Sequence, residues 1–355
     1  MHKLNLKDEI NSLLEISYSS RPWHTSLFTG LSLSGPLFIA AYFESIGLVG
    51  SIKLGVIASM AGLLFLYTLK TPIYHRMAVL MACGFGLMFS FIAGGLTHLT
   101  PNFISTTLGL LTLIVALGTR YYQIGGSYFF VMVATIIAFM PLQTDELIEL
   151  TGYFSLGLIW AWMMAFLYSI LTYKFTKPEQ VQPIVYRGFE YVVVDSVIIA
   201  FFIGLSTFLA LFLGFERPYW VPISTLAILQ GMTLRSNWSK QIHRIGGTII
   251  GLVLSCILLS INLGYYQMAL MVGALGFLID YTIVRNYGVA TIFMTPLTFY
   301  MAEITGIIDD LTVSIMLVRV GDIAFGSVMG FVGGIFLNSL SFRARIKSFI
   351  MTLIK

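Results

Sequence analysis

Four charged side chains stand within stretches that are otherwise apolar. Asp195, Asp280, Arg319 and Asp322 each fall inside a run long enough to cross a membrane. A charge at that depth is costly, and it usually faces the protein interior or a water-filled path. A carboxylate there can gain and lose a proton as its access alternates between two sides, so Asp195, Asp280 and Asp322 are the proton-coupling candidates. Arg319 and Asp322 share one helix face at three-residue spacing and are equally suited to neutralise one another.

A cluster of basic residues precedes a glycine-rich run. Arg235 and Lys240 lie shortly before Arg244, which leads into Gly246 and Gly247. We expect a helix to begin at Arg244, so that its positive N-terminal end and the basic side chains raise the local concentration of anions at a pore entrance. The positive-inside rule explains a basic loop without any substrate.

Aromatic and proline residues open the apolar stretch before this cluster. Trp220, Pro222, Ser224 and Thr225 predict a helix break whose backbone groups and hydroxyls face a cavity, as in transporters that bind ligands at broken helices. An aromatic belt at the membrane interface, together with helix packing, is the alternative.

Three adjacent residues further along the chain offer a guanidinium, an amide and a phenol. Arg285, Asn286 and Tyr287 suit a carboxylate that carries an aromatic ring, because Arg donates paired hydrogen bonds and Tyr supplies a stacking face. An interfacial anchor is the alternative. The predicted substrate pathway therefore comprises Trp220, Pro222, Thr225, Arg244, Arg285, Asn286, Tyr287 and Arg319.

These side chains belong to a very apolar chain. Of its 355 residues 57% are hydrophobic and only 10% are charged, and the mean hydropathy is +0.89. A water-soluble globule of this size cannot bury so much apolar surface, so the composition predicts an all-α polytopic membrane protein surrounded by lipid. The net charge of +4 is spread over short loops and argues against nucleic acid as a partner. No nucleotide-binding loop, metal-ligand spacing or nucleophile motif occurs, so we expect no enzyme activity, catalytic residue, cofactor or metal.

Apolar stretches long enough to span a hydrocarbon core number about twelve. If both ends of the chain lie in the cytoplasm, nearly all of the 20 Lys and Arg residues fall on the cytoplasmic side, in agreement with the positive-inside rule. The expected spans are 24–43, 46–69, 77–97, 102–119, 122–141, 147–173, 191–214, 218–234, 243–262, 264–284, 286–304 and 311–340.

A polar segment, Tyr173–Glu190, divides these spans into six plus six. Two six-span units keep the same orientation, so they can be parallel repeats. Each half has a basic loop leading into a glycine-rich third span, at Arg76 and at Arg244, and a proline in its fifth span, Pro141 or Pro296. The predicted organisation is an interfacial amphipathic helix over 1–23, a first six-helix repeat over 24–173, a cytoplasmic linker over 174–190, a second six-helix repeat over 191–340 and a basic tail over 341–355.

Motifs of the second half together resemble a known family. They are Tyr219-Trp220-Val221-Pro222-Ile223-Ser224-Thr225, Arg244-Ile245-Gly246-Gly247-Thr248-Ile249-Ile250-Gly251, Asn286-Tyr287-Gly288 with Met294-Thr295-Pro296, and Arg319-Val320-Gly321-Asp322 with Gly326. This set is similar to the membrane part of the fusaric acid resistance (FUSC) and aromatic acid exporter family, from about Arg187 to Gly330.

This resemblance implies a bacterial inner-membrane permease that exports organic acids together with a periplasmic adaptor protein. It also implies a distant relation to plant aluminium-activated malate channels. Long members insert a large soluble domain after each set of six spans, where this chain has the segment Tyr173–Glu190 and a short tail, so we expect a short form.

Three functions agree with these observations. The first is a proton-coupled exporter, acting as an antiporter and a homo-oligomer, for small organic anions such as aromatic or related carboxylic acids. The second is a passive organic-anion channel in which Arg244 and Arg285 set the selectivity. The third is a non-transporting membrane scaffold, against which the intramembrane charges argue.

Overall fold

The computed structural model of this protein describes residues 18, 21–124, 126–175, 177–181, 188–231, 233–261, 263–304 and 313–354. All regular structure in these ranges is helical, which confirms the predicted all-α class. The amphipathic helix predicted for residues 1–23 lies almost entirely outside the described residues, as does part of the predicted linker 174–190.

The described residues of the first half form six α-helices. Gly47 and Gly50 adopt left-handed backbone conformations in the turn between the first two, and the Glu44 carboxylate accepts hydrogen bonds from the backbone N–H groups of Gly50 and Ile52, which caps the second helix. The helices are α2 (Trp23–Ser45), α3 (Ser51–Met60) with its 3-10 continuation η1 (Ala61–Tyr67), α4 (Ile73–Leu96), α5 (Ile104–Tyr121), α6 (Tyr128–Phe139) and α7 (Glu146–Thr172).

The second half begins with a short π-helical turn that continues into a long helix. Gly214, with a φ of +69°, lies just after that long helix, and Pro222 lies in the first turn of the next one, where a missing N–H group costs little. The elements are η4 (Glu190–Val194), α8 (Asp195–Phe212), α9 (Trp220–Leu229), α10 (Leu234–Leu259), α11 (Tyr265–Ile283), α12 (Tyr287–Ile304), α13 (Val313–Asn338) and α14 (Leu340–Ile354).

Eight helices of the described part are long and apolar enough to cross a membrane, whereas the sequence predicted twelve spans. These eight are Trp23–Ser45, Ile73–Leu99, Pro101–Tyr121, Glu146–Thr172, Glu190–Phe212, Leu234–Leu259, Tyr265–Ile283 and Val318–Asn338. Three other predicted spans are shorter apolar helices, Ser51–Tyr67, Tyr128–Phe139 and Trp220–Leu229. The 10 residues of α9 extend over only about 15 Å, half of a hydrocarbon core, so α9 cannot cross on its own.

Two helix pairs form the largest contacts between the halves of the described chain. Helix α2 packs against α11, and α5 packs against α8. Glycines allow both approaches: Gly30 of α2 contacts Gly273 of α11, and Gly109 of α5 contacts Gly204 of α8. Within the halves, α4 packs on α6 as α10 packs on α12, and α3 with η1 packs on α7 as α9 packs on α13.

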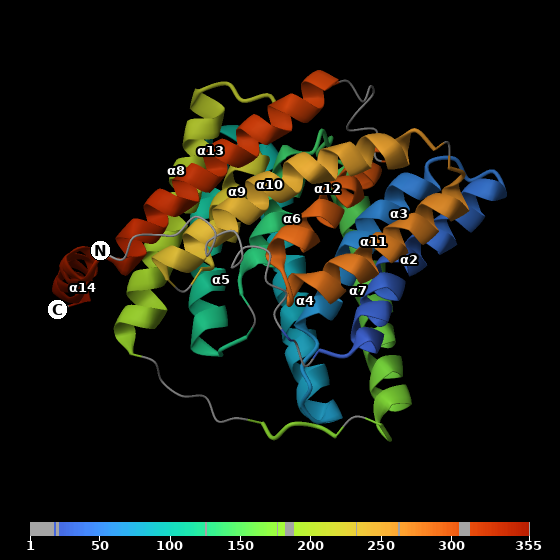
Figure 1. Ribbon diagram of the computed structural model, residues 1–355, viewed down its shortest axis with the longest axis horizontal. Helices are drawn as coiled ribbons and strands as arrows, with labels where there is room; N and C mark the ends of the chain where they lie inside the picture. Colours follow the sequence, from blue (N-terminus) through green and yellow to red (C-terminus); the bar gives the residue numbers. More distant parts are fainter. Residues whose placement is uncertain are drawn as a thin grey trace.

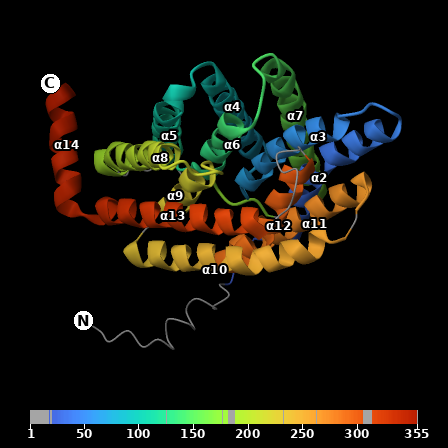
Figure 2. The same ribbon diagram turned by 90° about the horizontal axis from the view of Figure 1, so that it is seen from above.

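The long helices α10 and α13 run side by side along one face of the molecule, with α4, α5 and α7 on the opposite face (Figures 1 and 2). Helix α14 turns away from the end of α13, so the predicted basic tail 341–355 is helical over its described residues. Two ion pairs, Arg343 with Asp195 and Lys347 with Glu190, attach α14 to the start of α8.

Candidate functional site

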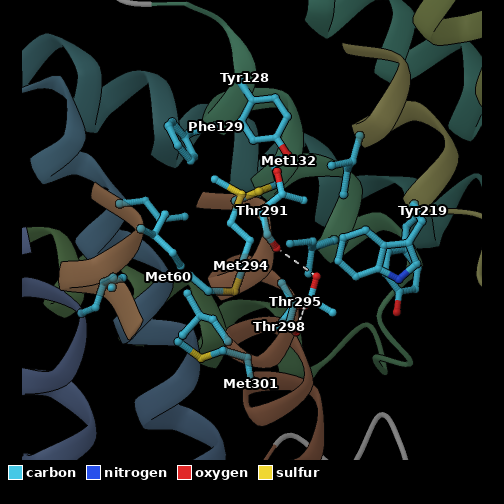
Figure 3. Close-up of a pocket in the computed structure, with 18 of the residues that line it drawn as sticks. Met60, Tyr128, Phe129, Met132, Tyr219, Thr291, Met294, Thr295, Thr298 and Met301 are labelled. Atoms are coloured by element: carbon cyan, nitrogen blue, oxygen red, sulfur yellow. Dashed lines mark hydrogen bonds between the residues drawn. The ribbon is translucent and has the colours of Figure 1, made fainter. Parts of the chain in front are cut away.

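A cavity of about 190 Å³ lies between the two halves of the chain. Helices α2, α3 and α6 and the turn η1 line it from the first half, and α9 to α13 line it from the second. Most of its wall is apolar, and Figure 3 shows aromatic and methionine side chains around it. These include Met60, Phe129, Met132, Met294 and Met301. A void of about 150 Å³ holds a benzene ring, so this one has room for a single ring with a small substituent.

Arg244 contributes one guanidinium to the cavity wall, and only 4% of the residue is exposed. Its Nε donates to the Ser224 hydroxyl at 3.1 Å, and its Nη1 donates to the Tyr287 hydroxyl at 2.9 Å. The phenol of Tyr128, on the other half of the chain, is a further electrostatic partner of the same guanidinium. Hydroxyl groups from three helices therefore hold this charge, and its hydrogen-bond partners in the described part of the chain include no carboxylate.

The prediction that a helix begins at Arg244 is wrong. Helix α10 begins at Leu234, after Thr233 accepts a hydrogen bond from the backbone N–H of Ser236. Arg244 therefore lies about three turns inside the helix, where the N-terminal dipole no longer acts. The basic segment from Arg235 to Lys240 is helical although Ser236, Asn237 and Ser239 are not strong helix formers, because the Thr233 cap starts the helix ahead of it.

Arg319 of α13 contributes the second guanidinium, and 5% of the residue is exposed. Its charge lies 3.9 Å from the centre of the Trp220 ring and 4.7 Å from that of Phe299. Its Nε has no hydrogen-bond partner. None of the described ion pairs joins Arg319 to Asp322. The ion pair that their spacing suggested is therefore absent among the described residues. A stacked guanidinium that still has an unused N–H group can donate a hydrogen bond to an incoming anion.

The cavity wall combines these two cations with no acidic side chain among its described residues. Threonine hydroxyls on α12 add polar atoms beside the apolar surface, and Figure 3 places Thr291, Thr295 and Thr298 along one side. A buried cation without a carboxylate nearby is costly, and an anion that enters the cavity would lower that cost. The arrangement thus suits a small anion that has an apolar, ring-sized body.

The predicted helix break around Pro222 does not occur. Helix α9 is continuous from Trp220 to Leu229, because Pro222 occupies its first turn. Trp220 lines the cavity, whereas Pro222 and Thr225 do not. The Thr225 hydroxyl donates to the carbonyl oxygens of Val221 and Gly326, so it binds α9 to α13.

The predicted cluster Arg285, Asn286 and Tyr287 divides between two roles. Only Tyr287 reaches the site, through its hydrogen bond with Arg244. Asn286 caps α12 by accepting a hydrogen bond from the backbone N–H of Val289 at 3.1 Å. Arg285 lies over the Tyr281 ring at 3.8 Å and donates to backbone carbonyl groups, away from the cavity wall.

Two of the three predicted proton-coupling carboxylates are held in ion pairs. Asp195 lies 3.1 Å from Arg120 of α5 and 3.1 Å from Arg343 of α14. Asp280 lies 2.9 Å from Arg21. The third, Asp322, is 2% exposed, lies outside the cavity wall and has one carboxylate oxygen without a hydrogen-bond partner.

Sequence reasoning missed the residues of the first half that line the cavity. Tyr128, Phe129 and Met132 of α6 face it, although the resemblance to a family draws attention only to the second half. A signal on α12 was available: Tyr287, Thr291, Thr295 and Thr298 recur at spacings of three and four, which place polar groups on one face of an apolar helix.

Comparison with known proteins agrees with the motif-based resemblance. Residues 205–333 match the family model described as fusaric acid resistance protein-like. The uncharacterized membrane protein YvaC of Bacillus subtilis (strain 168) is 34% identical over 134 residues, which cover 36% of this chain and 20% of that relative. The matched stretch therefore spans about a fifth of the relative's length. No solved structure gives a significant match. The predicted resemblance is confirmed, and it covers α9, α10, α11 and α12, with parts of α8 and α13.

Proposed function

We propose that this membrane protein, whose residues 205–333 form a fusaric acid resistance-like region, transports small organic anions across the membrane. The observation that carries the proposal is the central cavity, whose wall holds the guanidinium groups of Arg244 and Arg319 and no described carboxylate. A transporter needs a site for its substrate inside the membrane, and polar groups at that depth usually serve one.

The substrates that fit this site best are aromatic or related carboxylic acids of single-ring size. A guanidinium group recognises a carboxylate through paired, charge-assisted hydrogen bonds. Phe129, Trp220 and the methionine side chains offer the apolar contact that a ring requires. The volume of about 190 Å³ disfavours anions with two fused rings.

Export from the cytoplasm, coupled to protons, is the mode we propose. A buried carboxylate is suited to carry a proton, and of Asp195, Asp280 and Asp322 only Asp322 is held by no described ion pair. The membrane is the bacterial plasma membrane, with both ends of the chain on the cytoplasmic side.

We also propose that the two halves are parallel repeats. The halves join through α2 with α11 and through α5 with α8, and each junction carries a glycine contact and an ion pair, Arg21 with Asp280 and Arg120 with Asp195. Parallel repeats require the segment 174–190 and both ends of the chain on one side of the membrane. Labelling of single cysteines that places 174–190 on the opposite side from the ends would reject the repeat.

The test of transport is the movement of labelled benzenesulfonate into proteoliposomes. This aromatic anion stays ionised and crosses protein-free membranes slowly, so background leakage is low. We expect saturable uptake by the parent protein and a loss of uptake in Arg319→Gln. Uptake that does not saturate would indicate a passive channel. Uptake no faster than in protein-free vesicles would overturn the proposal that the protein transports organic anions.

A further inference from the structure

Asp322 is a buried carboxylate with an unusual environment. Only 2% of the residue is exposed, and its Oδ2 has no hydrogen-bond partner. The ion pairs formed within the described ranges use Asp195, Asp280 and Glu190, and none uses Asp322. A buried carboxylate outside an ion pair is costly as an anion, so its ionisation depends on the charged groups around it.

Three charged residues act on Asp322. Glu216 and Arg217 belong to the segment between α8 and α9, and Arg319 precedes Asp322 by three residues on α13. That spacing places Arg319 and Asp322 on one helix face, within reach of each other. In this structure, however, the Arg319 guanidinium stacks on Trp220 and lines the cavity.

We propose that Asp322 is the proton-binding group of the pathway and that Arg319 couples its proton to the bound substrate. The inference rests on the proposed transport of organic anions. The Arg319 guanidinium pairs with the Asp322 carboxylate in one state and with the substrate anion in the other. When Asp322 is ionised, Arg319 leaves Trp220 and pairs with it; the stacked position in this structure is that of the state with Asp322 protonated. When an anion occupies the cavity, Arg319 binds it, and Asp322 takes one proton from water.

This exchange keeps the charge of the buried site constant. The empty site holds the guanidinium groups of Arg244 and Arg319 and the Asp322 carboxylate, and these charges sum to +1. The loaded site holds both guanidinium groups, the anionic substrate and a neutral carboxyl group, and these charges again sum to +1. The anion and the proton together therefore add no net charge to the membrane interior, where a further uncompensated charge would be costly.

The sign of the coupling follows from this arrangement. Protonation of Asp322 releases Arg319 for the substrate, so the proton and the anion strengthen each other's binding, and linkage requires the effect to be reciprocal. The two are then carried in the same direction, which is co-transport, whereas the sequence led us to expect an antiporter. An acid that accumulates inside a cell would leave with a proton, down its own gradient.

Calorimetric titration of the detergent-solubilised protein with benzenesulfonate tests the linkage. Titrations in two buffers that differ in ionisation enthalpy give the number of protons taken up with each anion. We expect about one proton for the parent and an affinity that falls by up to about tenfold per pH unit above neutrality. In Asp322→Asn, which resembles the protonated carboxyl, we expect no proton uptake and an affinity that no longer varies with pH.

A matched control and a flux measurement complete the test. Glu216→Gln removes an exposed carboxylate close to Asp322 and should keep the proton uptake of the parent. In proteoliposomes containing a pH-sensitive dye, an inward gradient of benzenesulfonate should carry protons inward with the parent and none with Asp322→Asn. Proton movement in the opposite direction, or proton uptake that persists in Asp322→Asn, would overturn the inference. No benzenesulfonate binding by the parent at any pH would instead reject the proposed function itself.

Discussion

Arg76 and Arg244 are two buried arginines of the two halves of this chain, and only one of them faces the cavity. Arg76 of α4 uses all three of its nitrogen atoms inside the protein. Its Nε donates to the Leu69 carbonyl oxygen at 2.6 Å, Nη1 to the Ser169 hydroxyl at 2.9 Å and Nη2 to the Thr71 carbonyl oxygen at 3.0 Å. Arg244 of α10 instead binds the hydroxyl groups of Ser224 and Tyr287 at the edge of the cavity.

The difference follows from where each arginine lies along its helix. Arg76 is in the first turn of α4, so the backbone carbonyl groups of the preceding segment are near enough to saturate it. Arg244 is about three turns into α10, far from the end of that helix, so side chains of other helices provide its partners. A hydroxyl group can rotate and exchange partners, whereas a backbone carbonyl oxygen is a fixed acceptor. Burial alone therefore does not mark a binding arginine, but the kind of acceptor around it does.

Among the changes that test this comparison, Arg244→Gln should have the largest effect on binding. This change removes a buried charge that would contact the substrate, and loss of one partner of a buried charge pair costs roughly 2–5 kcal/mol. We expect the affinity for benzenesulfonate to fall by at least about 30-fold. The measurement is equilibrium binding to monodisperse protein in detergent, normalised to the folded fraction.

Arg76→Gln is the matched control for that change. It removes three hydrogen bonds from the first half, and since hydrogen bonds between membrane helices average about 0.6 kcal/mol, the protein should lose roughly 2 kcal/mol of stability. The thermal unfolding midpoint should fall, while the folded fraction binds benzenesulfonate as the parent does. Equal losses of affinity in both variants would show that the contrast between the two arginines has no functional meaning.

A smaller effect is expected from Tyr287→Phe. The Tyr287 hydroxyl accepts a hydrogen bond from Arg244, and the loss of one such bond costs about 1 kcal/mol, or about fivefold in affinity. The corresponding change beside Arg76 is Tyr168→Phe, which removes a hydroxyl bonded to Thr25 at 2.9 Å. That variant should bind with unchanged affinity. A larger loss in Tyr168→Phe than in Tyr287→Phe would place the binding site in the first half.

The helical class and the main charges of the site follow from the sequence. The apolar composition predicts the helical membrane class. The charge of Arg319 within an apolar stretch and the motifs around Arg244 and Trp220 point to three residues that line the cavity. The ion pairs do not follow from the sequence. Asp195 meets Arg120 across 75 residues and Asp280 meets Arg21 across 259, separations over which no local pattern acts.

Hydropathy also failed to predict the lengths of the helices. The apolar run 218–234 looks like one crossing, but a turn at Gln230 and Gly231 ends α9 after 10 residues and starts α10 early. The polar segment from Arg235 to Lys240 resembles a loop but belongs to α10, because the Thr233 cap starts the helix ahead of it. Hydropathy counts apolar residues, whereas helix ends depend on capping and on turn geometry.

The smallest expected effect tests what the first half contributes. Phe129 of α6 lines the cavity and offers a ring face, so Phe129→Leu should weaken benzenesulfonate binding by about threefold, because an aromatic pair contributes about 0.5–1.5 kcal/mol. Binding of methanesulfonate, which has no ring, should not change. The neighbouring Phe130 packs in the core of the first half, so Phe130→Leu should lower stability without altering affinity. An equal loss for both anions in Phe129→Leu would mean that this ring positions the guanidinium groups and does not contact the substrate.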